Sequence, residues 1–264
     1  METFDTFKAA QREGWAHFAP MAVTTTVPAA RLVRFAGIAP GDRVLDVACG
    51  TGVVAVTAAR AGATVIGLDL TPQLLSVARD NASVAGVDVD FQEGDCERIP
   101  AADGAFDVVV SQFGHIFAPR PEIALGEMLR VLRPNGTIAF STWPPELFVG
   151  RLFALVARYL PPPEGVPPPA LWGDPDVVRQ RFGDAVRDLR FDRDTMLASS
   201  LSPAHSRQAT ERSAGPVIRL VESLQERDPA RLEAFRRDYD ALAAEYFEQN
   251  TLRQGFLLTR AIKR

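Results

Sequence analysis

Five short apolar runs alternate with helix-length amphipathic stretches between residues 43 and 140, and this alternation limits the possible folds most strongly. Runs rich in Val, Ile, Leu and Phe are typical of strands that are buried on both faces of a parallel sheet. Helices between such strands provide the crossovers that parallel pairing needs. The pattern therefore predicts a doubly wound α/β sheet, with strands at residues 43–47, 64–68, 87–91, 106–110 and 136–140.

Helices are predicted between these strands and before the first one. Thr71 is a candidate N-cap for the second crossover helix, with Pro72 at its first position. Pro134 and Gly136 should end the third. Residues 1–40 precede the core, and we expect them to form helices that act as a lid. The predicted crossover helices are residues 53–61, 72–85 and 122–132.

The pattern changes after the core, where residues 144–253 are predicted to form a mainly helical insertion that holds the acceptor site. Two adjacent apolar rows at helical spacing mark one helix of this insertion. Such a wide apolar surface can face a core and a ligand at once. A proline-rich connector follows at residues 161–169, and further strands are expected at residues 186–191 and in the closing segment 254–264. The rows are Phe148, Leu152, Leu155 and Tyr159, and Val149, Phe153, Val156 and Leu160.

The composition argues against several classes of partner. A formal net charge of -4 and an isoelectric point near 5.5 disfavour broad binding to a phosphate backbone, which needs clustered Lys and Arg. We therefore expect no nucleic-acid partner. No uncharged apolar run is long enough to span a membrane, and the charged N-terminus does not match a secretory signal, so a cytoplasmic location without a membrane partner is expected. Cys49 and Cys96, with three unclustered histidines, predict neither a disulfide nor a metal site.

A glycine turn follows the first predicted strand, at Gly50-Thr51-Gly52. Glycine lets the backbone approach a ligand closely. Dinucleotide-binding folds use a similar turn, so the turn alone leaves a nicotinamide-dependent oxidoreductase open. Asp46 favours another ligand, because a carboxylate beside the turn suits an ammonium group and would repel a pyrophosphate.

Two more carboxylates follow the second and third predicted strands. Asp69 can accept hydrogen bonds from both hydroxyls of a ribose, or it can cap the next helix. Asp95, in Gly94-Asp95-Cys96, could accept from an adenine amino group. Together with Asp46, these residues should line the sheet edge where ligands bind in this fold class.

These segments together resemble the class I S-adenosylmethionine-dependent methyltransferases, most closely the small-molecule group that includes the ubiquinone and menaquinone biosynthesis methyltransferases. The resemblance covers residues 15–140 and implies S-adenosylmethionine as cofactor, S-adenosylhomocysteine as product, and a seven-stranded sheet whose last strand is antiparallel. It also implies a turn at residues 132–137 before the fifth strand. Ala48 departs from the family pattern, which most often has a third glycine there. The implied cofactor contacts are Trp15, Asp46, Ala48, Gly50, Thr51, Gly52, Asp69, Leu70, Asp95, Cys96 and Ser111.

The catalytic candidates follow the fourth predicted strand. Methyl transfer needs in-line alignment and exclusion of water, plus a base where the acceptor carries a proton. His115 is the predicted base, since the unperturbed pKa of histidine lies near neutrality, and a structural histidine in a loop is the alternative. Gln112 is the second candidate, and His17 on the N-terminal helix is a weaker rival.

The sequence is therefore interpreted as a methyltransferase that acts on a small-molecule acceptor through an oxygen, nitrogen, carbon or sulfur atom that the sequence does not identify. Two other classes stay open at this stage. One is an NAD(P)-dependent oxidoreductase, and the other is a protein that binds an adenosine nucleoside without catalysis. A homodimer is also compatible with the apolar helical surface of the insertion.

Overall fold

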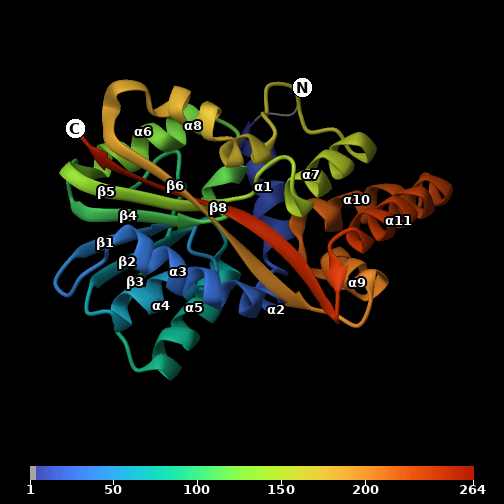
Figure 1. Cartoon of the computed structure of the whole chain (residues 1–264), viewed down its shortest axis with the longest axis horizontal. Helices are drawn as coiled ribbons and strands as arrows, with labels where there is room; N and C mark the ends of the chain where they lie inside the picture. The colour runs from blue at the N-terminus through green and yellow to red at the C-terminus, as the bar shows by residue number, and fades with distance from the viewer. Residues whose placement is uncertain (1–3) are drawn as a thin grey trace.

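The computed structural model describes residues 4–264, which form one mixed sheet flanked by helices (Figure 1). The strands are β1 (Arg43–Val47), β2 (Thr64–Asp69), β3 (Asp90–Glu93), β4 (Phe106–Gln112), β5 (Leu132–Thr142), β6 (Val186–Ser199), β7 (Phe247–Glu248) and β8 (Thr251–Lys263). Their order is β3-β2-β1-β4-β5-β8-β6, and β7 pairs with β8. β1 to β5 run parallel, whereas β8 is antiparallel to both β5 and β6. The predicted fold class is confirmed, with the short β7 as an addition.

Helices cover both faces of the sheet. The main ones are α1 (Phe4–Trp15), α2 (Ala19–Ala22), α3 (Thr26–Ala36), α4 (Val53–Arg60), α5 (Pro72–Ala85), α6 (Pro121–Val131), α7 (Phe148–Tyr159), α8 (Pro175–Phe182), α9 (Pro203–Ser213), α10 (Gly215–Gln225) and α11 (Pro229–Ala244). In Figure 1, α3, α4 and α5 lie on one face, and α6 and α8 lie on the other. Thr71 is the N-cap residue of α5, but its side chain makes no capping hydrogen bond. Residues 1–3 of the predicted lid lie outside the described residues.

Two strands are longer than the sequence predicts. Leu132 already pairs with Phe106 of β4, so residues 132–137 are part of β5 and not a separate turn. The register shifts within this stretch, where Asn135 has a left-handed φ of 61°. β6 continues to Ser199 because β8 pairs with it along its length. Both extensions depend on a partner strand that local sequence does not reveal.

Two clusters of buried hydrophobic residues stabilise the fold. The first lies between the sheet and the helices that cover it. The second involves α7, α10 and α11 with the start of β8. Leu152 and Val156 of α7 belong to the second cluster, while Phe153 packs against the first. The helix with two apolar rows therefore joins the sheet to α10 and α11, which lie to the right in Figure 1.

Among residues 4–264, no helix combines the length and the apolar character that crossing a membrane requires.

Candidate active site

A pocket lies along the edge of the sheet formed by the carboxyl ends of β1 to β4. The strand order places Asp95, Asp69, Asp46 and Gln112 in sequence along this edge, because β3, β2, β1 and β4 are neighbours. All four residues line the pocket, which α1 covers and which α7 and α10 close on the far side. The carboxylates that sequence reasoning placed at three strand ends therefore meet at one site.

The turn after β1 uses three left-handed residues. Ala48, Gly50 and Gly52 have φ values of 54°, 55° and 77°. At Gly52 a Cβ would lie 2.9 Å from the ring of Phe91, so only glycine fits there. Ala48 takes the place of the family's third glycine and is accommodated because residue 114 is also glycine: a Cβ on Gly114 would lie 2.6 Å from the Ala48 methyl group. The small residues Ala48 and Gly114 therefore let the backbone of the turn lie close to the pocket.

Asp46 is a buried carboxylate with one oxygen left free. Its Oδ2 atom accepts a hydrogen bond of 2.9 Å from the backbone N–H of Ala55. Its Oδ1 atom has no hydrogen-bond partner among residues 4–264. Burial raises the pKa of Asp46 to about 8, opposed by the Ala55 N–H and reinforced by the charge of Asp69. A cationic group brought to Oδ1 would relieve this cost.

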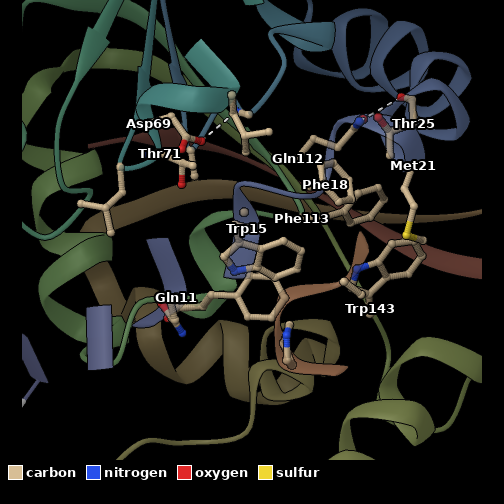
Figure 2. Close-up of a pocket in the computed structure, with 18 of the residues that line it drawn as sticks. Gln11, Trp15, Phe18, Met21, Thr25, Asp69, Thr71, Gln112, Phe113 and Trp143 are labelled. Carbon is tan, nitrogen blue, oxygen red and sulfur yellow. Dashed lines mark hydrogen bonds between the residues drawn. The ribbon is translucent and has the colours of Figure 1, made fainter. Parts of the chain in front are cut away.

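Asp69 connects the glycine turn with the residue that precedes α5. Its Oδ2 atom accepts from the N–H of Gly50 at 2.7 Å, and its Oδ1 atom accepts from the N–H of Thr71 at 2.8 Å, so it ties the glycine turn to the start of α5 (Figure 2). Burial raises its pKa, and these N–H groups oppose the increase. A carboxylate oxygen can accept a second hydrogen bond, so Asp69 can still bind a hydroxyl.

Lys8 of α1 is a site residue that sequence reasoning missed. Its Nζ atom donates to Asp95 Oδ2 at 2.6 Å and also contacts Glu97, whose side chain is 1% exposed. Burial lowers the pKa of Lys8, but hydrogen bonds to the two carboxylates outweigh this and raise it overall. Gln11, one turn later, donates to the carbonyl oxygen of Phe117 at 3.1 Å. The two contacts hold α1 over the pocket.

His115 does not reach the pocket, and its prediction as a base is wrong for this geometry. The ring is fully buried between Phe140 and Trp172, with ring centroids 4.7 Å away in each case. Neither ring nitrogen has a partner among residues 4–264. Burial and the charge of Arg181 lower the pKa of His115 to about 3. An imidazole enclosed by aromatic rings away from the pocket has no route to an acceptor proton, which leaves the alternative of a structural histidine.

Two predicted cofactor contacts also lie outside the pocket lining. Ser111 is fully buried. Its Oγ atom donates to the carbonyl oxygen of Val47 at 2.6 Å, and this bond joins β4 to β1. Gly52 lies against the ring of Phe91, so it shapes the turn and does not line the pocket. The remaining candidates line the pocket: Trp15, Asp46, Ala48, Gly50, Thr51, Asp69, Leu70, Asp95 and Cys96.

Beyond Gln112 the pocket is mainly aromatic and aliphatic. Figure 2 shows Trp15, Phe18, Phe113 and Trp143 across the cavity from Asp69. Phe113 and Trp143 are stacked, with ring centroids 3.9 Å apart. This surface was only partly predictable, because sequence reasoning placed Phe18 in the predicted lid and Trp143 in the core without giving either residue a role of its own.

Several known proteins are similar to this chain in sequence or in fold. Residues 44–136 match the family model of a methyltransferase domain. A protein of Mycobacterium tuberculosis described as uncharacterised is 36% identical over 98% of this chain and 96% of its own length. A demethylmenaquinone methyltransferase of Thermus thermophilus is 42% identical over 39% of this chain and 48% of that protein. The crystal structure of the YcgJ protein of Bacillus subtilis superposes with a TM-score of 0.61 at 20% identity, over 89% of this chain and 97% of that one, which shows a common fold.

The chain therefore carries the methyltransferase domain of the class I S-adenosylmethionine-dependent methyltransferases and is an enzyme. It belongs to one family with the mycobacterial protein, to which it is related along nearly its whole length, including residues 144–253. The resemblance to quinone methyltransferases concerns less than half of this chain.

Proposed function

We propose that this enzyme transfers the methyl group of S-adenosylmethionine to a small-molecule acceptor. The observation that carries the proposal is the free, buried Oδ1 atom of Asp46 beside a turn of left-handed small residues. A buried carboxylate oxygen without a partner is costly unless a ligand pairs with it, and the methionine part of S-adenosylmethionine carries an ammonium group. A dinucleotide would place phosphate charge at the same turn, where the Asp46 carboxylate would repel it.

The strand order supports a separate role for each acidic residue. Asp46 would bind the ammonium end, Asp69 the ribose hydroxyls and Asp95 the adenine amino group, because they follow neighbouring strands. When bound, S-adenosylmethionine supplies a methyl group made electrophilic by its sulfonium. Gln112 and Phe113, at the end of β4, lie next to the methionine subsite and are the residues that would meet the acceptor.

The part of the pocket beyond β4 is called the acceptor end here. Its side chains are suited to aligning the acceptor and excluding water, and not to transferring a proton. Asp46, Asp69 and Asp95 face the cofactor, and Tyr239 is the ionisable side chain that lines the far end. Burial raises the pKa of Tyr239, and its hydroxyl lies 2.9 Å from that of Thr210. A phenol held in this way is a weak base at neutral pH. We therefore propose that Trp15 and α1 exclude water, while Gln112 orients an acceptor that needs no protein base.

Calorimetric titration with S-adenosylmethionine, S-adenosylhomocysteine and NAD tests this proposal. We expect micromolar-range binding of the first two compounds and no measurable binding of NAD. Tight NAD binding would favour an oxidoreductase. Binding of S-adenosylmethionine without methyl transfer to any acceptor in a broad screen would favour a non-catalytic nucleoside-binding protein.

A further inference from the structure

We infer that the acceptor is an uncharged, largely apolar molecule that presents one O–H or N–H group to Gln112 and takes the methyl group at another atom, so that this group keeps its proton. This inference rests on the proposed methyltransferase activity and concerns the part of the pocket beyond β4. It separates this enzyme from methyltransferases whose acceptors are amines or carboxylates recognised through ion pairs.

Charge is distributed unequally along the pocket. Its charged lining residues are Lys8, Arg12, Asp46, Asp69 and Asp95, and all of them come from α1 or from the ends of β1 to β3. The lining contributed by β4, β5, α7 and α10 contains no charged side chain. A charged acceptor would therefore lose its hydration without gaining an ion pair, which disfavours its binding strongly.

Apolar side chains form most of the acceptor end. Val149, Leu152, Phe153 and Val156 of α7 face Val217 of α10 across it. Phe153 also packs edge-to-face with Phe117, at 5.6 Å between ring centroids. Burial of an apolar ligand against this surface is favourable in proportion to the area removed from water.

The polar groups at this end are uncharged, and most already have partners inside the protein. Thr25 Oγ1 donates to the carbonyl oxygen of Ala22, and Thr210 Oγ1 donates to that of Ser206. The Gln112 amide is different. Its Nε2 atom donates to the carbonyl oxygen of Thr25 at 2.9 Å, which fixes the side chain as Figure 2 shows. Its Oε1 atom is buried and has no partner among residues 4–264. A single donor on the acceptor would satisfy it.

Four probes that share a naphthalene ring test this assignment at pH 7. The neutral donor is 2-naphthol, the anion is 2-naphthoate, the cation is 2-naphthylmethylammonium, and 2-methoxynaphthalene is neutral without a donor. Each is titrated calorimetrically into the enzyme saturated with S-adenosylhomocysteine. We expect 2-naphthol to bind at least about tenfold more tightly than either ion, and several-fold more tightly than its methyl ether. An ion that binds as tightly as 2-naphthol, or a complex that takes none of the four probes, would overturn the inference.

Variants then locate the bound probe. Phe153→Ala should weaken 2-naphthol binding at least about tenfold and leave the affinity for S-adenosylhomocysteine within about twofold. Ile123→Ala, at a 42% exposed position on α6, is the matched control and should change neither. Probe affinity that survives Phe153→Ala would contradict an apolar acceptor end. Failure of the wild-type protein to bind S-adenosylhomocysteine would instead contradict the proposed function, whatever the probes do.

Discussion

Asp69 uses one carboxylate for two purposes, since it holds the glycine turn and also faces the pocket. Both oxygens already accept backbone N–H bonds, and burial raises the pKa of the side chain. Sequence reasoning treated helix capping and ribose binding as alternatives. In the structure its bonds go to Gly50 and to Thr71, the N-cap residue of α5, so Asp69 holds the turn without capping the helix, and ribose binding stays a prediction.

Asp69→Ala should weaken the binding of S-adenosylmethionine and S-adenosylhomocysteine by about 1.5 to 3 kcal/mol, the range for hydrogen bonds that involve a charged partner. Calorimetry of both ligands measures the change. Asp80→Ala, on the exposed surface of α5, is the control and should bind both ligands as the wild type does. Unchanged affinity in Asp69→Ala would mean that the ribose does not bind at the end of β2.

His115 should make the protein less stable in acid. Its pKa of about 3 in the folded state is below the ordinary value of 6.5, so below pH 6.5 the unfolded chain binds a proton that the folded chain does not. The free energy of unfolding should therefore fall, by up to about 1.4 kcal/mol for each pH unit between 6.5 and 3. Urea titrations of wild type and His115→Leu over pH 4 to 8 should show a flatter pH dependence in the variant.

His17→Leu is the matched control for that series, because His17 is exposed on the surface. Its stability should follow the pH dependence of the wild type. Equal slopes for wild type and His115→Leu would contradict a neutral buried ring. Position in the sequence indicated a loop histidine near the site, but it could not indicate which side of the loop the ring faces.

At the scale of elements, the buried strands were predictable and the extended ones were not. The runs at 43–47, 64–68 and 106–110 coincide closely with β1, β2 and β4, because burial on both faces requires continuous apolar sequence. β6 carries charged residues along much of its length, and its extent depends on pairing with β8 more than 50 residues later. The contact of Lys8 with Asp95 spans 87 residues, so no local pattern could have revealed it.

Lys8→Met should loosen α1. The change removes a cation from between Asp95 and the buried Glu97, which retains Arg120 as a charged partner. We expect faster hydrogen exchange throughout α1 and dissociation of S-adenosylhomocysteine that is faster by roughly tenfold, equivalent to about 1.4 kcal/mol. Exchange mass spectrometry and stopped-flow displacement measure the two effects.

Glu13→Gln is the control on the same helix. Glu13 is exposed and lies outside the pocket lining, so its loss should not affect the buried contacts of α1. Its exchange and dissociation rates should stay near those of the wild type. If both variants release the product equally fast, the buried contact of Lys8 does not hold α1 closed.

The two apolar rows of α7 should differ in what they stabilise. Phe148 is 1% exposed and contacts Tyr239 and Tyr246 in the second cluster, so Phe148→Ala should lower the free energy of unfolding by about 3 to 5 kcal/mol. Phe153 is only partly buried and lines the pocket, so Phe153→Ala should cost clearly less. Chemical denaturation of both variants measures the difference. Loss of dimerisation in Phe153→Ala without loss of probe binding would indicate that this row forms an interface.

At the scale of the whole molecule, α1 spans the pocket between the sheet edge and α10. Its middle reaches Asp95 through Lys8, and its C-terminal end crosses α10, where a Cβ on Gly14 would lie 3.0 Å from the Cα atom of Gly215. The pocket lies beneath this helix and is lined by residues of both clusters. A ligand that holds α1 closed should therefore stabilise the helical insertion as well as the sheet.

Saturation with S-adenosylhomocysteine should protect β1 to β4, α1 and α10 together from hydrogen exchange. At 100 times the Kd, the free energy of unfolding should rise by about 2.7 kcal/mol, since the ligand binds only the folded state. Thermal unfolding should remain a single transition, because α7 contributes to both clusters. Residues 188–195 at the outer edge of the sheet provide an internal reference and should exchange at unchanged rates. Protection confined to the ends of β1 to β3, with α10 unaffected, would show that cofactor binding and the acceptor end are not coupled through α1.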